Sequence, residues 1–268
     1  ATAVVVWACV TVVRAHPIDW EAYQTGEKEL GIVDEREFWT LAVGRELTDP
    51  PRYAEDFLGS KLMQNWQEAV SDGAEADAAQ LNLAYVSADP EIYRWFYRDR
   101  EERETDLSDL PMTAYLINLG MTSMNAPLSV RVLDTVGLAT PIAARMPRDP
   151  DGRVGHDKQL DPAWQAADTD TYLDGLPQFI STLRAKQARA ALRSPEISEL
   201  LATSREPMSW DRFWANVRYS LTDGRTLQLS PDPGVYIDAE TRRAIRRGED
   251  PGLEGPRIAW PVEAGSDK

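Results

Sequence analysis

The sequence predicts a mainly α-helical protein with a small β-hairpin near the C-terminus. After Trp20, apolar side chains recur at spacings of three and four residues, which is typical of helices that bury one face. Residues that cap or break helices separate these segments at short intervals. Near the C-terminus the runs RTLQL and VYI have a residue composition typical of strands. With 268 residues, the chain is long enough to bury a sizeable core.

The first thirteen residues, ATAVVVWACVTVV, carry no charge. As a helix they would extend about 20 Å at ~1.5 Å per residue, less than the ~30 Å hydrocarbon core of a bilayer. They would then form the lower part of a membrane span, with Arg14 and Trp20 following as at a water interface. Their many β-branched side chains equally favour a strand buried on both faces. For the apolar stretch 1–20 both alternatives therefore stay open.

The charge and the motifs exclude several classes of function. A formal net charge of −15 argues against nucleic-acid binding, which needs clustered basic residues. The only histidines, His16 and His156, are too far apart for a local metal pair, and the single cysteine excludes an internal disulfide. No G-x-S-x-G, P-loop or G-x-G-x-x-G motif is present. We therefore predict no cofactor, and we assign no catalytic residue.

Residues 168–170 form a short acidic motif. Asp168 and Asp170 form a D-T-D triplet like the metal-binding pair of some sugar transferases, but no apolar strand precedes it. Such triplets arise often in a chain with 44 acidic residues. We therefore predict no metal site.

Residues 21–145 are predicted to form a helical half. Asp34 is expected to cap a helix that runs to about Arg45, and a second helix carries an apolar stripe from Phe57 to Val70 and ends at Gly73. The alanines of segment 75–88 favour a helix, although its LNLAYV end is typical of a strand.

Segment 87–104 is predicted to be a helix, because Asp89 suits the N-cap and Pro90 the first helical position. Its mixture of aromatic residues and arginines is typical of a protein interface. The structural alternative, which we favour, is a core helix whose arginines point outward. The interface candidates are Arg94, Trp95, Tyr97 and Arg98.

Charge nearly disappears between residues 110 and 140, where only Arg131 and Asp134 are charged. Adaptable thioethers and a few amides would suit a pocket for an apolar ligand or a protein helix. The alternative, which we favour, is the central core of the domain. The candidate pocket residues are Met112, Asn118, Met121, Met124 and Asn125.

The loop 145–162 is rich in proline, glycine and aspartate and is predicted to separate the two halves. A second helical half, residues 163–222, contains helices over 177–192, 194–201 and 209–221, the last with a stripe at the spacing of a buried face. Residues 223–268 are predicted to form the hairpin and an extended tail.

Four arginines stand in this acidic tail. They are spaced so that a helix would present two pairs on one face, which would suit a phosphate, an anionic lipid or an acidic partner. The alternative, which we favour, is a surface helix neutralised by neighbouring carboxylates. These binding candidates are Arg242, Arg243, Arg246 and Arg247.

Together these features predict a non-catalytic accessory or scaffold subunit of a larger, membrane-associated assembly, with other protein chains as partners. Anionic lipid at the C-terminal arginines is a further predicted partner. A protein of another class, a soluble cofactor-independent enzyme or a small-molecule binder that uses region 110–140, is the alternative. Membrane association is favoured over a soluble location.

Overall fold

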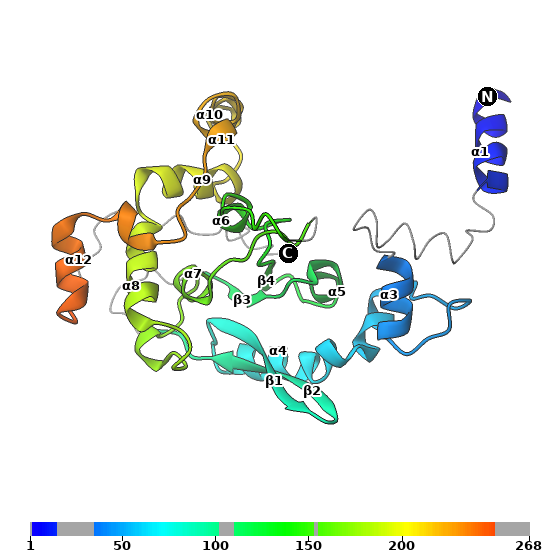
Figure 1. Ribbon diagram of the computed structural model, residues 1–268, viewed down its shortest axis with the longest axis horizontal. Helices are drawn as coiled ribbons and strands as arrows, with labels where there is room; N and C mark the ends of the chain where they lie inside the picture. The colour runs from blue at the N-terminus through cyan, green and yellow to red at the C-terminus, as the bar shows by residue number, and fades with distance from the viewer. Residues whose placement is uncertain (1, 15–34, 102–109, 153–154, 250–268) are drawn as a thin grey trace, which may run out of the picture. The chain divides into compact units, whose positions relative to one another are not determined.

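The computed structural model describes residues 2–14, 35–101, 110–152 and 155–249 (Figure 1). The chain divides into two compact units, residues 1–50 and 51–268. The first contains helices α1 and α3, and the second contains a four-stranded sheet and the remaining helices. The extended tail predicted beyond residue 249 lies outside the described residues.

The apolar start of the chain forms a helix, α1 (Thr2–Arg14), so the buried-strand alternative is wrong. The side chains of residues 2–10 are exposed, with Val4 at 66% and Trp7 at 70% of their full accessibility. A helix pairs its backbone groups within itself, whereas a strand needs neighbouring strands, and this run has no glycine or proline to interrupt it. In the part of the chain that the structure describes, no helix has the length and apolarity to cross a membrane. α3 (Glu35–Ala42) is the helix predicted after Asp34.

The second unit contains a mixed sheet in the order β2-β1-β3-β4. β1 (Gln80–Ala88) and β2 (Glu91–Arg98) pair antiparallel, while β3 (Met112–Tyr115) runs parallel to β1 and to β4 (Val130–Leu133). The fold is therefore mixed α/β, and the prediction of a mainly α protein is wrong.

The β1–β2 hairpin occupies residues that we predicted to be helical. Side chains alternate across its two faces, and Leu81 pairs with Tyr97 while Leu83 pairs with Trp95. The crowded aromatic positions of segment 87–104 would point all round a helix, but in a strand they alternate between two faces. Aromatic and β-branched residues also favour strands. Asp89 and Pro90, predicted to start a helix, instead join the two strands.

One face of the hairpin is covered by α4 (Trp66–Glu75), which follows the short 3₁₀ helices η1 (Ala54–Gly59) and η2 (Lys61–Met63). The single helix predicted over 57–73 is thus divided. Asn65 interrupts it, because its left-handed backbone (φ 54°) cannot continue a right-handed helix. The Asn65 side chain instead binds the backbone of Trp95, accepting from its N–H and donating to its carbonyl, both at 2.9 Å.

A helical core forms the rest of the second unit. It involves α6 (Pro141–Ala144), α7 (Pro162–Ala167), α8 (Thr182–Ala191) and α9 (Pro195–Arg205). α9 corresponds to the helix predicted over 194–201, whereas α8 covers only the later part of the helix predicted over 177–192 because it begins at Thr182. The core contains Ile142 from before the loop 145–162 and Trp164, Ile197 and Leu229 from after it. α5 (Leu119–Met124) packs near β4.

The hairpin predicted from RTLQL and VYI is absent, and this prediction is wrong. These residues contribute to α11 (Asp223–Thr226) and η4 (Pro233–Tyr236), which α12 (Ala239–Arg246) follows. The backbone N–H of Leu229, in the first of the two runs, donates instead to the carbonyl of Arg145 at 2.8 Å. Leu229 and Ile237 are instead buried in the helical core.

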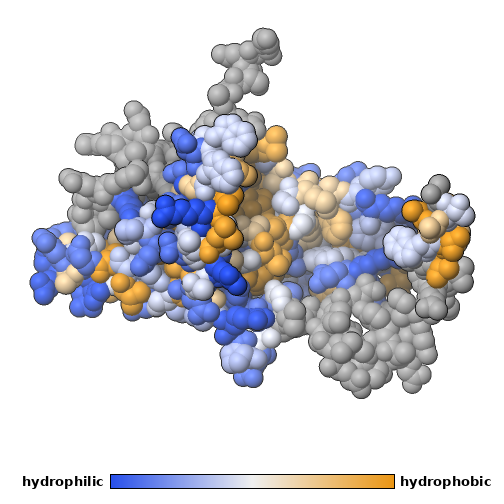
Figure 2. Space-filling model, turned by 90° about the horizontal axis from the view of Figure 1, so that it is seen from above, coloured by the Kyte–Doolittle hydropathy of each residue, from blue (hydrophilic) through white to orange (hydrophobic). Residues whose placement is uncertain are grey.

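Helix α10 (Trp210–Leu221) is present as predicted, but its orientation is not the expected one. Its apolar stripe faces solvent, with Trp210 at 78% and Trp214 at 62% exposure. Figure 2 views the molecule from the side on which α10 lies in Figure 1, and apolar side chains reach the surface there. The polar face packs against the protein, where Arg212 is buried and binds Glu199 and Glu206.

Candidate functional site

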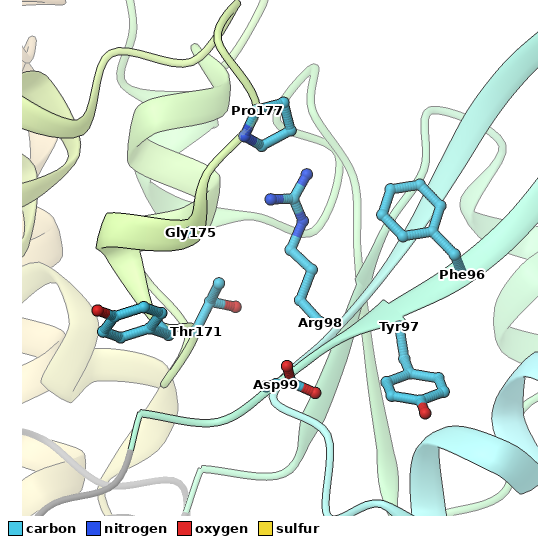
Figure 3. Close-up of a pocket in the computed structure, with 8 residues that line it drawn as sticks. Phe96, Tyr97, Arg98, Asp99, Thr171, Gly175 and Pro177 are labelled. Carbon is cyan, nitrogen blue, oxygen red and sulfur yellow. The ribbon is translucent and has the colours of Figure 1, made fainter.

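The candidate site is a pocket between the end of β2 and the segment that follows α7. Its volume is about 320 Å³, at the low end of the ~300–1,000 Å³ typical of ligand sites. The end of β2 forms what we call the inner wall, and the segment after α7 forms the outer wall. The 3₁₀ helix η3 (Leu173–Gly175) belongs to the outer wall. The pocket is lined by Phe96, Tyr97, Arg98, Asp99, Thr171, Tyr172, Gly175 and Pro177 (Figure 3).

Arg98 is the central polar group of this pocket. Its side chain extends towards Pro177, on the opposite side of β2 from the ring of Tyr97 (Figure 3). Its guanidinium carbon lies 5.5 Å from the centre of the Phe96 ring, a cation–π contact. Burial lowers the pKa of Arg98. None of the described residues accepts a hydrogen bond from the buried Arg98 Nε, so this donor lacks a partner within the described protein.

A second donor stands on the same face of the hairpin. Asn82 is the cross-strand partner of Phe96, and its buried Nδ2 also lacks an acceptor among the described residues. Gln80, the partner of Arg98, differs because its Oε1 accepts from Thr171 Oγ1 at 3.2 Å. The inner wall therefore combines the Phe96 ring with the unsatisfied Nε of Arg98, while Asn82 does not line the pocket.

The outer wall is tied to the end of β2. The backbone N–H of Tyr172 donates to the carbonyl of Asp99 at 3.2 Å, and Arg100 forms a β-bridge with Thr171. The Tyr172 side chain is 50% exposed. At Gly175 an added Cβ would lie only 3.2 Å from the Tyr172 ring, so the ring rests against this bare backbone. Glycine at this position therefore permits the observed place of the ring.

Buried ion pairs hold the outer wall from behind. Arg100 Nη1 lies 3.1 Å from Asp170 Oδ2. Arg189 on α8 donates to the carbonyls of Thr169 and Thr171 at 3.2 and 2.6 Å and pairs with Glu101. The segment before η3 is therefore fixed by charged hydrogen bonds rather than by apolar packing.

Asp168 anchors the same segment to the sheet and to α9. Arg205 binds both of its oxygens, at 2.7 and 2.6 Å, and the Tyr115 hydroxyl donates to it at 3.0 Å. Burial alone would raise the pKa of Asp168, but the charges of Arg205 and Arg131 and these hydrogen bonds hold it at about 2. Burial and the Asp168 charge raise the pKa of Tyr115 well above its usual value.

Both carboxylates of the D-T-D triplet are thus paired with arginines, since Arg205 donates to Asp168 and Arg100 donates to Asp170. Within residues 2–14, 35–101, 110–152 and 155–249, no cluster of His, Cys, Asp or Glu is arranged to hold a metal ion. In this structure the triplet is a structural anchor behind the pocket.

The four interface candidates of segment 87–104 lie on both faces of the hairpin, and an interface formed by them stays a prediction. Trp95 is buried against Trp66, with ring centres 4.6 Å apart. Tyr97 lies on the α4 face of the hairpin, since its Cβ approaches Gly73. Arg94 is exposed, and Arg98 enters the pocket on the other face.

The candidates of region 110–140 are also dispersed. Met112 and Met121 are buried, whereas Met124 is 54% exposed. The side-chain amide of Asn125 donates to the backbone carbonyls of Ala54 and Met121. The backbone carbonyl of Asn125 accepts from Trp66 Nε1. Asn118 precedes α5 and is partly buried. The described pocket includes none of these residues, and ligand binding by them stays a prediction.

The arginines of α12 divide into two kinds. Arg242 donates to the carbonyls of Gly234 and Ile237, and Arg247 forms a two-bond pair with Glu249 at 2.5 and 2.7 Å. Arg243 and Arg246 are exposed. The binding of an anionic lipid here stays a prediction and would depend mainly on these two exposed arginines.

Sequence reasoning missed most of the pocket. Arg98 and Tyr97 were named, but as parts of a helical interface. Asp99 and Tyr172 were not named, because nothing in the sequence indicates that positions 73 residues apart are neighbours. The available signal was the alternation of aromatic residues and arginines in 92–98, which fits a strand with one polar face.

The comparisons with known proteins identify a family and two relatives that match most of the chain. The family model described as "AftB family C-terminal domain" matches residues 59–239. A terminal β-(1→2)-arabinofuranosyltransferase of Corynebacterium glutamicum is 44% identical over 267 residues, which are 98% of this chain and 37% of the relative. One of the same name from Mycobacterium tuberculosis is 33% identical over 199 residues, 71% of this chain and 30% of the relative. No solved structure matches.

The chain spans about a third of the length of these curated relatives. Both relatives are named for a glycosyl-transfer reaction, so the prediction of a non-catalytic accessory or scaffold subunit is wrong. The D-T-D triplet was the sequence feature nearest to a transferase motif, but in the structure its carboxylates are engaged in buried ion pairs. The family model covers more than half of the chain, and the chain therefore belongs to the AftB family, whose C-terminal domain it contains.

Proposed function

We propose that this chain is the C-terminal part of a membrane-associated arabinofuranosyltransferase that forms terminal β-(1→2) linkages. The observation that carries the proposal is the 44% identity over nearly the whole chain to a transferase of that name. The family match over 59–239 supports it independently of that one relative.

The reaction implied by the name is a glycosyl transfer. The 2-hydroxyl oxygen of the acceptor forms a bond to the anomeric carbon of an activated arabinofuranosyl donor, the bond from that carbon to the leaving group breaks, and the hydroxyl proton is lost to a base. Within the described residues, the buried carboxylates Asp168 and Asp170 are committed to arginines. We therefore assign the base to neither of them.

Membrane association is supported by α1. The helix exposes Val4, Val5 and Trp7, and water-exposed apolar helices of this kind are stabilised when lipid or protein covers them. The proposal needs only that this helix contacts the apolar layer of a membrane.

The test is transfer by the full-length protein in a detergent or membrane preparation. It would receive an activated arabinofuranosyl donor and an acceptor that ends in arabinofuranose. We expect one added residue, and methylation analysis of the product should show the acceptor residue substituted at its 2-position. The Corynebacterium glutamicum relative is the positive control. Transfer by the relative but none by this protein under the same conditions would overturn the proposal.

A further inference from the structure

The pocket at the end of β2 has the composition of a site for a neutral polyhydroxyl ligand. The guanidinium of Arg98 supplies an unsatisfied donor, and the exposed carboxylate of Asp99 supplies acceptors. Sugar hydroxyls can both accept and donate, so one such ligand would use both groups. An inorganic anion would use only the guanidinium and would be repelled by the neighbouring carboxylate.

Aromatic surfaces flank these polar groups. Phe96 is 39% exposed and Tyr172 is 50% exposed, and they belong to opposite walls of the pocket. Their rings offer apolar area at small cost in conformational entropy, which suits the C–H faces of a furanose ring. A wholly apolar ligand would leave the buried Arg98 Nε without an acceptor, and this is costly.

The pocket is also preorganised in the ligand-free protein. Its outer wall is fixed by Arg100, Arg189 and the Tyr172–Asp99 hydrogen bond, and its inner wall is the hairpin itself. Binding therefore requires little ordering of the protein, which favours affinity from few contacts. Because the pocket is small and open to the surface, it would admit one end of a long glycan chain rather than its interior.

We propose that this pocket binds the terminal arabinofuranosyl residue of a glycan, with Arg98 donating to its oxygens and Tyr172 covering its ring face. The identity of the sugar rests on the proposed function, whereas the polyhydroxyl class rests on the pocket itself. The site is a binding site that holds the glycan end, and no bond is made or broken by these residues.

The test is direct binding to the purified chain of residues 1–268. Arabinofuranosyl oligosaccharides would be titrated by NMR, with xylopyranosyl oligosaccharides and inorganic phosphate as comparison ligands. We expect saturable binding of the arabinofuranosides alone. Comparable binding of the pyranosides, or tighter binding of phosphate, would overturn the assignment of the ligand.

Variants locate the site. Arg98→Ala and Arg98→Lys should each weaken binding about tenfold, because both remove the Nε–H donor. Tyr172→Ala should weaken it several-fold and, being half exposed, should leave the fold intact. Arg94→Ala is the matched control, since Arg94 lies on the same strand and face but outside the pocket, and it should bind like the parent. Equal affinity of the parent and the folded Tyr172→Ala and Arg98→Lys variants would overturn the inference.

The inference and the proposed function fail separately. If the folded chain binds no arabinofuranoside while the full-length protein still transfers arabinofuranose, the pocket assignment is wrong and the function stands. In the full-length enzyme, Tyr172→Ala should raise the KM for the acceptor with kcat almost unchanged, the pattern of lost substrate binding. An unchanged KM would count against the pocket.

Discussion

At the scale of single residues, Asp168 illustrates how tertiary context decides the role of a carboxylate. It is 1% exposed, yet it stays ionised because Arg205 binds both of its oxygens and Arg131 lies within 3.6 Å. A buried pair of this kind contributes most when it is complete, because removing one partner leaves an uncompensated charge in the interior.

We expect Asp168→Asn to lower the free energy of unfolding by about 3–5 kcal/mol, since Arg205 would remain buried without its countercharge. Urea unfolding measures the change. The matched control is Asp174→Asn, because Asp174 also pairs with a cation, Lys186, but is half exposed and should contribute at most about 1 kcal/mol. Equal losses in the two variants would contradict this role of Asp168.

The same residue gives the protein a defined acid sensitivity. The pKa of Asp168 is about 2 in the folded chain, below its ordinary value of 3.8, so folding favours the ionised form. Its stabilisation is complete above pH ~4 and is lost as the pH falls through about 2. The full contribution is about 2 kcal/mol. Carboxyl-carbon NMR titration measures this pKa directly, and an ordinary value near 4 would show that the arginines do not hold the charge.

At the scale of elements, α10 shows that amphipathicity alone does not say which face is buried. The polar face is held against α9 by Arg212, whose guanidinium binds Glu199 at 2.6 Å and Glu206 at 2.9 Å. Asn216 adds a hydrogen bond to the carbonyl of Thr203 at 3.0 Å. These directional contacts orient the helix and leave its aromatic stripe outside.

From this orientation we expect opposite results for two substitutions on α10. Trp214→Ser should change the free energy of unfolding by less than about 0.5 kcal/mol, as is usual at exposed positions. Arg212→Met should lower it by about 1–3 kcal/mol, because it removes charged hydrogen bonds from a buried position. Chemical denaturation of both variants checks the order. A larger loss for Trp214→Ser would mean that the stripe is buried after all.

At the scale of the whole molecule, the sheet and the helical core of residues 51–268 share buried groups. Tyr115 on β3 belongs to the helical core, and Arg131 on β4 binds the segment after α7. Arg100, just beyond β2, pairs with Asp170. Unfolding of either the sheet or the helical core would therefore leave buried charges of the other without their partners.

We consequently expect the described part of residues 51–268 to unfold as one cooperative unit. Hydrogen exchange followed by mass spectrometry should give the same free energy of opening for β1 as for α8. α10, which contacts mainly its neighbours α9 and α11, should open at lower cost. Protection that persists in α8 after β1 has exchanged completely would contradict this coupling.

For the candidate site, the sequence alone provided only Arg98 and Tyr97, and it placed them on a helix. The pocket joins β2 to a segment beyond α7, and a contact between such distant positions leaves no trace in local spacing. The family relationship likewise rests on a long match, over residues 59–239.

The sequence by itself determined the helices whose signals are local. Pro195 at the start of α9 and Ser209, whose hydroxyl accepts from the Arg212 N–H, begin helices where we predicted them, because a cap needs only its own turn. Only the tertiary structure decided the β1–β2 hairpin and the outward face of α10. Their backbone and side-chain partners lie far away in the chain, and burial against those partners outweighs the small energies of local propensity.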